Sequence, residues 1–414
     1  MSGWSGAVRT LVLSALIAGA LSSCAALPDR VTYTPSESDQ ARLAGFPDDI
    51  RFWADAQSKV VIREATERFA AEQKAGLYKA GKAPPARILA LSGGGEDGAF
   101  GAGLLAGWSE QGGRPTFDIV TGVSTGSLIA PLAFVGSTKD AELKAAYTTI
   151  DKKAILAVRS IFAILVGDSL ATTAPLRDMI SRYVTPDLIS AIAQEHAKGR
   201  RLYVITTNLD AQRPVLWDMG RIASSGHPGT VALFREVLVA SAAVPGVFPP
   251  VYFDAEAEGR RFQEMHVDGG VTAQVFSVPV AAALAATTAP AIAGRKRTLY
   301  VIVNNRMEPQ FGQAKRGLLP IAGRSISTLI KVHGAGGVRD LYHLARSVGA
   351  DFRLAYVDRG FTDIAPTPFD KAYMNKLFQH GYELGRRGYP WKDVPPGLDE
   401  DKPLHPSAPA AGSG

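Results

Sequence analysis

Short apolar runs alternate with longer amphipathic stretches along most of this chain. The apolar runs have the length of strands and lie at 88–91, 117–123, 202–207, 215–217, 266–267, 299–303 and 353–357. Between most of them, apolar positions recur at helical spacing, and two long helical segments are predicted at 321–350 and 369–387. Short strands that alternate with longer helices are typical of a mainly parallel sheet covered by helices. The pattern therefore predicts a layered α/β fold.

The first residues have the pattern of an export signal. Arg9 precedes an apolar run at 11–21, and small residues follow up to Cys24. The run is too short to cross the hydrocarbon core of a bilayer, which takes about 20 residues. We therefore expect residues 1–23 to be a cleaved signal peptide.

The remaining chain divides by composition into four parts. Residues 24–50 are polar and interrupted by proline, and they are predicted to form a tether. Residues 51–86 carry apolar and charged positions at helical spacing and are expected to form an N-terminal helical segment. Residues 87–390 contain the strand-like runs and form one predicted main domain that ends in helices. Residues 391–414, with Pro, Ala, Gly and Ser, lack the apolar content to pack and are expected to be disordered.

Composition and charge narrow the possible classes of protein. The chain has 414 residues, of which 46% are hydrophobic, so it can bury a core. Its formal net charge of +6 is too small to indicate a nucleic-acid partner. Cys24 is the single cysteine, so no internal disulfide can form, and no His/Cys/Asp cluster has metal-ligand spacing. Neither a metal nor another cofactor is expected. Basic pairs or triplets precede several strands and are expected at a solvated sheet edge, namely at 200–201, 260–261 and 295–297.

A glycine-rich loop follows the first strong strand. Residues 92–98 read Ser-Gly-Gly-Gly-Glu-Asp-Gly and precede a predicted helix. Exposed backbone N–H groups at a helix N-terminus bind an anion, either a phosphate or a developing oxyanion. Gly93, Gly95 and Gly98 also satisfy the dinucleotide-binding pattern G-x-G-x-x-G. That pattern requires an acidic residue at the end of the next strand, whereas Asp118 stands at its start.

The next strand ends in a G-x-S-x-G sequence. Gly122, Ser124 and Gly126 lie between the apolar run 117–123 and the helix-compatible stretch 128–134. A nucleophile elbow has this arrangement, because the serine occupies a strained turn and the glycines let neighbouring backbone pass close by. Coupled to the glycine loop upstream, this motif predicts a nucleophilic serine beside an oxyanion site.

A serine hydroxyl needs a base to accept its proton. His266 lies in a strand-like run, and His333, His343 and His380 lie in helical stretches, where a structural role is expected. Asp268 follows a short strand and precedes two glycines, so its carboxylate would be presented on a tight turn at a sheet edge. Asp268 is therefore the candidate base.

These motifs, in this order, resemble the signature of the patatin-like phospholipase family. The segments at 206–210 and 240–250 are also similar to that family, and the resemblance covers about residues 87–270. It implies a three-layer α/β/α fold with a mainly parallel central sheet. It also implies a Ser-Asp dyad without histidine, in which Ser124 is the nucleophile and Asp268 the base. The oxyanion hole would be formed by the backbone amides of Gly93, Gly94 and Gly95.

The implied activity is hydrolysis of acyl esters of membrane lipids, of phospholipase A or lysophospholipase type, with no cofactor. Two alternatives stay open: an α/β-hydrolase-type esterase with a Ser-His-Asp triad, and a non-catalytic lipid-binding lipoprotein. The loop also departs from the family pattern, since Asp97 stands where a basic residue is usual. We interpret this change as weakening a preference for strongly anionic head groups.

A second resemblance concerns the N-terminus. Leu21-Ser22-Ser23-Cys24 is similar to the lipobox of bacterial lipoproteins, in which the cysteine is acylated and becomes the mature N-terminus. Ala25, rather than Asp, follows the cysteine, which in that class is consistent with sorting to the outer membrane. The resemblance implies a lipid-anchored protein of the bacterial cell envelope that faces the periplasm. Its expected partners are the membrane and a lipid acyl ester; no nucleic acid is expected, and protein partners are not predicted.

Overall fold

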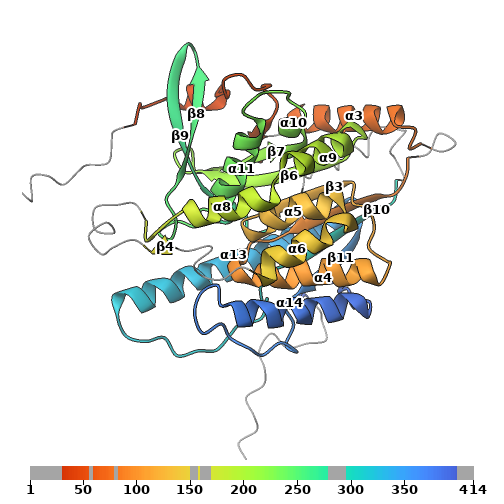
Figure 1. The fold of residues 1–414 in the computed structure, drawn as a ribbon, viewed down its shortest axis with the longest axis vertical. Coiled ribbons are helices and arrows are strands. Elements are labelled where there is room, and N and C mark those ends of the chain that lie inside the picture. Colours follow the sequence, from red (N-terminus) through yellow and green to blue (C-terminus); the bar gives the residue numbers. More distant parts are fainter. Residues whose placement is uncertain are drawn as a thin grey trace, which may run out of the picture.

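A single twisted sheet organises the molecule (Figure 1). The computed structural model describes residues 30–55, 59–78, 83–149, 157–158, 169–277 and 295–398. Within these residues, nine strands form the sheet, and the pair β4 (Ala157–Val158) and β5 (Ala171–Thr172) forms a separate ladder. The main path runs in the order β1 (Arg51–Trp53), β7 (Arg213–Asp218), β6 (Arg201–Asn208), β3 (Ile119–Val123), β2 (Ala86–Leu91), β10 (Arg297–Val303) and β11 (Asp351–Tyr356).

The centre of the sheet is parallel and one side is antiparallel. Strands β6, β3, β2, β10 and β11 pair in parallel with one another, in that order. Strands β7 and β1 add antiparallel pairs beyond β6. The hairpin of β8 (Val251–Ala257) and β9 (Arg260–Asp268) also joins β6 antiparallel, through β9. The predicted α/β fold with a mainly parallel central sheet is thus confirmed, whereas the long hairpin was not expected from the run at 266–267.

Helices cover both faces of the sheet. The longer ones are α3 (Lys59–Lys74), α4 (Gly98–Glu110), α5 (Thr125–Val135), α6 (Asp140–Thr148), α8 (Ala174–Tyr183), α9 (Pro186–Ala197), α11 (Thr230–Ser241), α13 (Leu318–Ser347) and α14 (Lys371–Arg386). The short ones are α2 (Pro35–Asp39), α10 (Met219–Ala223) and the 3₁₀ turns η1 (Gly95–Asp97), η2 (Ser137–Lys139) and η4 (Gly269–Val271). In Figure 1, α4, α5 and α6 lie in front of the strands, and α13 emerges from behind them. No helix among the described residues is long and apolar enough to cross a membrane.

Successive residues of β2 point into two different cores. Leu89 and Leu91 of β2 point into the larger core, which contains α4, α5, α11 and α14. Ala90, between them, packs in the second core with Val338 and Leu341 of α13. Strands buried on both faces read as nearly continuous apolar runs, which is the pattern that predicted them.

The carboxyl ends of the parallel strands place the functional residues together. The glycine loop follows β2, Ser124 follows β3, and Asn304 follows β10. Because these three strands are neighbours in the sheet, their C-terminal ends meet at one edge.

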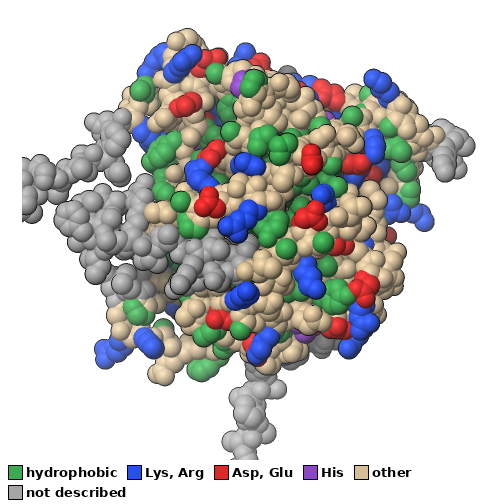
Figure 2. All heavy atoms as spheres, viewed as in Figure 1, with side chains coloured by type: hydrophobic (Ala, Val, Ile, Leu, Met, Phe, Trp, Pro, Cys, Tyr) green, Lys and Arg blue, Asp and Glu red, His purple; other side chains and the backbone are tan. Residues whose placement is uncertain are grey.

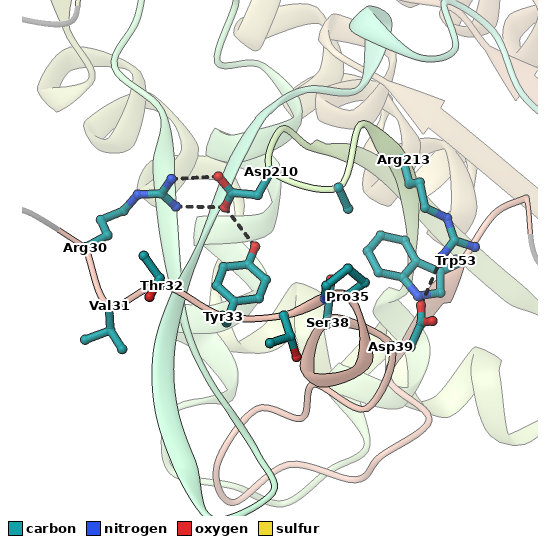
Figure 3. Close-up of a pocket in the computed structure, with 12 residues that line it drawn as sticks. Arg30, Val31, Thr32, Tyr33, Pro35, Ser38, Asp39, Trp53, Asp210 and Arg213 are labelled. Carbon is teal, nitrogen blue, oxygen red and sulfur yellow. Dashed lines mark hydrogen bonds and ion pairs between the residues drawn. The ribbon is translucent and has the colours of Figure 1, made fainter.

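Residues 30–50 pack on the domain rather than running free as the predicted tether. Arg30 pairs with Asp210 at 2.6 Å, and Figure 3 shows both Arg30 and Tyr33 directed at that carboxylate. Tyr33 stacks on Phe262 of the hairpin, with ring centroids 4.4 Å apart. An open pocket, which ends at Trp53, lies between this segment and the strands. The hairpin, absent from the sequence prediction, supplies much of the surface that holds the segment.

The beginning of the expected disordered tail also packs. Trp391 lies against Trp108, with ring centroids 4.9 Å apart, and Lys392 pairs with Leu354 at the edge of β11. Residues 399–414 lie outside the described residues, as do residues 1–29 with the export signal and Cys24.

Three of the arginines expected at a solvated sheet edge are buried. Arg295 pairs with Glu72 of α3 at 2.9 Å, and Arg200 pairs with Glu195 of α9 at 2.7 Å. Arg201 is also buried. Acidic side chains from flanking helices neutralise these cations, so the positions need no contact with water.

Candidate active site

Ser124 occupies a strained turn between β3 and α5. Its φ of 52° and ψ of −124° are unusual for a residue with a side chain. The turn requires both flanking glycines: a Cβ on Gly122 would lie 2.5 Å from the carbonyl oxygen of Gly126. A Cβ on Gly126 would lie 2.5 Å from the carbonyl oxygen of Leu91. The turn therefore has the strained backbone and the close backbone approach that a nucleophile elbow requires.

Asp268 lies at the end of β9 and meets Ser124 directly. The Ser124 hydroxyl donates to Oδ2 of Asp268 at 2.6 Å, and the Gly270 amide donates to Oδ1 at 2.6 Å. Both side chains are buried. Asp268 pairs with Thr206 of β6, and this strand register fixes where along the sheet the carboxylate lies. The structure thus brings together two residues that are far apart in the sequence.

The environment of Asp268 changes its acidity. Burial raises the pKa of Asp268 to about 6, although the hydrogen bonds from Ser124 and Gly270 act in the opposite direction. A carboxylate with a raised pKa holds a proton more readily than an exposed one. Asp268 is therefore better suited to accept a proton near neutral pH than an ordinary aspartate.

Histidines are engaged elsewhere in the molecule. His405 lies outside the described residues, and no hydrogen bond or ion pair joins any other histidine to Ser124 or Asp268 in the part that the structure describes. His266, two residues from Asp268, places Nδ1 2.8 Å from the Thr206 hydroxyl and Nε2 3.5 Å from Glu264. Burial lowers the pKa of His266 below its usual value. These contacts indicate a structural role for His266.

The glycine loop lies beside Ser124, but its three amides are not equivalent. A Cβ on Gly93 would lie 3.2 Å from the Ser124 Cβ. The Gly93 amide, however, donates to the carbonyl oxygen of Gln274 at 2.9 Å, so it is not available to an oxyanion. Within the described residues, the amides of Gly94 and Gly95 donate to no group. The predicted set of three donors therefore reduces to Gly94 and Gly95.

Two side chains that the motifs did not reveal hold this loop. Asn304, fully buried, donates through Nδ2 to the Ser92 carbonyl at 2.8 Å and accepts the Gly101 amide at 3.1 Å. Gln274 donates through Nε2 to the Gly270 carbonyl at 2.9 Å, which links the loop to the turn after Asp268. The position of Asn304 directly after a buried parallel strand was a usable signal, since such ends gather at one edge.

An apolar pocket opens at Ser124 and Gly95. Its other lining residues are nearly all apolar and come from α5, α6, α8, α11, the loop after α11 and the start of α14: Leu128, Leu132, Leu176, Met179, Ile180, Leu238, Phe248 and Met374 are among them. Tyr147 also lines the pocket. Its hydroxyl is hydrogen-bonded to the Thr125 hydroxyl at 2.7 Å, so the polar end of this side chain is satisfied. Such a lining suits a hydrocarbon chain.

Asp97 does not face Ser124. The hydroxyl of Tyr373, on α14, donates to Oδ1 of Asp97 at 2.6 Å. Burial raises the pKa of Asp97 to about 6. Asp97 therefore joins the glycine loop to α14 in this structure.

An acidic cluster outside the site already holds a cation. Asp49, Glu64 and Glu67 approach one another closely enough to hold a metal ion. The guanidinium of Arg221 contacts all three, at 2.6 Å from both Asp49 and Glu64. Arg221 thus supplies the positive charge that these carboxylates need.

Comparisons with known proteins found a matching family model. Residues 89–284 match the model of the patatin-like phospholipase family. The crystal structure of VipD from Legionella pneumophila superposes with a TM-score of 0.37 and 12% identity, over 74% of this chain and 67% of that one. A search of the curated proteins finds no match. The matched range contains the glycine loop, Ser124 and Asp268. Residues 89–284 are therefore similar to the patatin-like phospholipase family, a family of lipid acyl hydrolases.

Proposed function

We propose that this protein is a serine acyl hydrolase that cleaves acyl esters of membrane lipids, with phospholipase A or lysophospholipase specificity, through Ser124 and Asp268. The observation that carries the proposal is the 2.6 Å hydrogen bond from a strained serine to a buried carboxylate, within residues similar to the patatin-like phospholipase family. The apolar pocket that opens at the same serine supports a substrate with a fatty acyl chain.

The proposed reaction has two halves. Ser124 Oγ attacks the ester carbonyl carbon while its proton passes to Asp268, and the amides of Gly94 and Gly95 stabilise the oxyanion. The tetrahedral intermediate then expels the alcohol, which takes the proton from Asp268. In the second half, Asp268 accepts a proton from water, the resulting hydroxide attacks the acyl-serine, and collapse releases the fatty acid and returns the proton to Ser124.

The rival triad mechanism receives no support from the described histidines, because no hydrogen bond or ion pair joins any of them to Ser124 or Asp268. A non-catalytic lipid-binding protein would need neither the strained turn at Ser124 nor its carboxylate partner. Ester hydrolysis by the purified protein, and its loss in the dyad variants, decides between these functions.

We expect the activity to depend on the ionised form of Asp268. Because burial raises the pKa of Asp268 to about 6, kcat/KM for a soluble ester should rise as the pH increases through that value and then level off. Asp97 has a pKa raised to the same range, so Asp97→Asn is the matched control. This variant should keep the rise, since Asp97 contacts Tyr373 and not Ser124. A flat profile between about pH 5 and pH 7, or a rise that disappears in Asp97→Asn, would contradict the assignment.

We further propose that Cys24 is acylated and holds the protein at the envelope membrane, on the periplasmic side of the outer membrane. The lipobox-like sequence supports this location. The mature chain would then have 391 residues (414 minus 23). After a high-salt wash, which removes electrostatic contacts, the wild-type protein should stay with membranes and Cys24→Ala should not. If Cys24→Ala remained uncleaved and membrane-bound, the segment would be an ordinary anchor.

A further inference from the structure

The first half of α13 presents apolar side chains to solvent. Ile321, Ile326, Leu329 and Val332 are all more than half exposed, and Leu329 is 69% exposed. The last three follow each other at three-residue spacing and share a face of the helix with Ile321. Phe311, in the segment just before the helix, is wholly exposed. A helix on the surface of a soluble domain normally turns such a face inward.

The polar face of the same half contacts the segment that precedes the helix. Arg324 donates to the carbonyl oxygen of Gln310 at 2.6 Å. Lys331 donates to the Glu308 carbonyl at 3.1 Å and to Oε1 of Gln310 at 2.8 Å. These bonds hold the helix in an orientation that leaves its apolar face outward. In the structure the apolar side chains of this half therefore point to solvent, away from residues 308–310.

The second half of α13 is an ordinary core helix. Val338, Leu341 and Ala345 are buried against β10 and β11. One continuous helix thus has an anchored half and an outer half, and Figure 1 shows the outer half projecting beyond the other layers. An apolar face carried in this way marks an interaction surface.

Charge indicates what covers this face. No acidic residue occurs between Glu308 and Asp340, whereas Lys315, Arg316, Arg324 and Lys331 do. Lys315 and Arg316 are exposed immediately before the helix, and neither forms an ion pair with another described residue. Figure 2 shows basic and hydrophobic side chains together at the projecting end. An apolar face with basic residues beside it is complementary to an anionic lipid surface.

The same helix reaches the candidate active site. Two residues after Val332, a Cβ at Gly334 would lie 3.6 Å from the Cβ of Gln274. The Gln274 carbonyl in turn accepts the amide of Gly93 in the glycine loop. The helix that carries the exposed face therefore also packs, on its other side, against a residue that positions the loop beside Ser124.

We infer that the outer half of α13, together with Phe311, Lys315 and Arg316, docks on the surface of an anionic lipid bilayer. The apolar side chains enter the boundary between head groups and acyl chains, and the basic side chains contact lipid phosphates. The inference rests on the proposed function only for the purpose of docking, which is to bring the site to its lipid substrate. Vesicle binding itself is measured independently of catalysis.

The test uses the full chain with Cys24→Ala, so that no acyl anchor contributes, and measures binding to vesicles. Phosphatidylcholine vesicles are compared with vesicles that also contain phosphatidylglycerol. One variant, Ile326→Ser with Leu329→Ser, removes apolar contacts, and a second, Lys315→Glu with Arg316→Glu, reverses charge. Matched controls change exposed residues elsewhere: Val31→Ser with Leu77→Ser, and Arg261→Glu with Arg387→Glu.

We expect tighter binding to the anionic vesicles. The charge variant should weaken that binding by about 25-fold or more, since each Lys or Arg near an anionic surface contributes about fivefold. The apolar variant should weaken it by at least about tenfold. The matched controls should change it by less than about twofold, and every variant should hydrolyse a soluble short-chain ester at the wild-type rate.

Equal binding by the docking variants and their controls would overturn the inference. Concentration-dependent self-association that only the apolar variant abolishes, without vesicle binding, would assign the face to a second copy of the chain instead. Absence of soluble-ester hydrolysis in the starting protein would contradict the proposed function alone, because the vesicle measurement does not depend on it.

Discussion

Ser124→Ala and Asp268→Asn should each lower kcat/KM for ester hydrolysis by about 10³-fold or more. The first variant removes the nucleophile. The second leaves a neutral amide at the position where the buried carboxylate accepts the serine proton across 2.6 Å. Hydrolysis of a soluble chromogenic ester and of phospholipid in vesicles measures both losses.

Folding is the necessary control for Asp268→Asn, and the structure predicts its outcome. Burial raises the pKa of Asp268 from 3.8 to about 6, so the folded protein binds this proton more tightly than the unfolded chain. The free energy of unfolding of the wild type therefore falls as the pH rises from about 4 through about 6. Above that range Asp268→Asn should be more stable than the wild type, by up to about 3 kcal/mol. A stable Asp268→Asn protein with activity within about tenfold of the wild type would contradict its role as base.

Gly94→Ala should have the second-largest effect, about 10³-fold on kcat/KM, with substrate binding affected less. A Cβ at Gly94, where φ is +159°, would lie 1.8 Å from the carbonyl oxygen of Asn304. The loop must move away, and the amides of Gly94 and Gly95 move with it. Loss of one oxyanion donor typically costs about 10²- to 10³-fold in rate.

Gly112→Ala is the matched control for this substitution. Gly112 has a φ of +82° but nothing within 4 Å of the added Cβ, so the change tests backbone strain without a collision at the site. It should reduce stability by about 1 kcal/mol and leave kcat/KM unchanged. Wild-type activity in Gly94→Ala would show that the glycine loop does not provide the oxyanion hole.

Local sequence was sufficient to predict the residues whose geometry is determined locally. The turn at Ser124 depends on Gly122 and Gly126, which stand two residues away on either side, so its motif was readable. The hydrogen bond from the Gly93 amide to the Gln274 carbonyl was not predictable, because Gln274 is distant in the sequence. Asn304 was missed for the same reason, since its contacts cross from β10 to the loop after β2.

The fold was predictable where burial on both faces produced continuous apolar runs, as in β2 and β10. The hairpin was not predicted as a whole, because the first half of β9 alternates buried and exposed residues and begins with two exposed arginines. The burial of the arginines was not predictable for a related reason. The burial of Arg295 follows from Glu72 on α3, and no local pattern at 295–297 indicates that partner.

Covalent labelling with a fluorophosphonate tests the central claim most directly, because it reports which side chain is the activated nucleophile. We predict one label per chain, located on Ser124 by peptide mass, at a rate that falls by about 10³-fold in Asp268→Asn and is unchanged in His333→Gln, His343→Gln and His380→Gln. Labelling of another residue, or loss of labelling in one of the histidine variants with Asp268→Asn unaffected, would contradict the Ser124–Asp268 dyad.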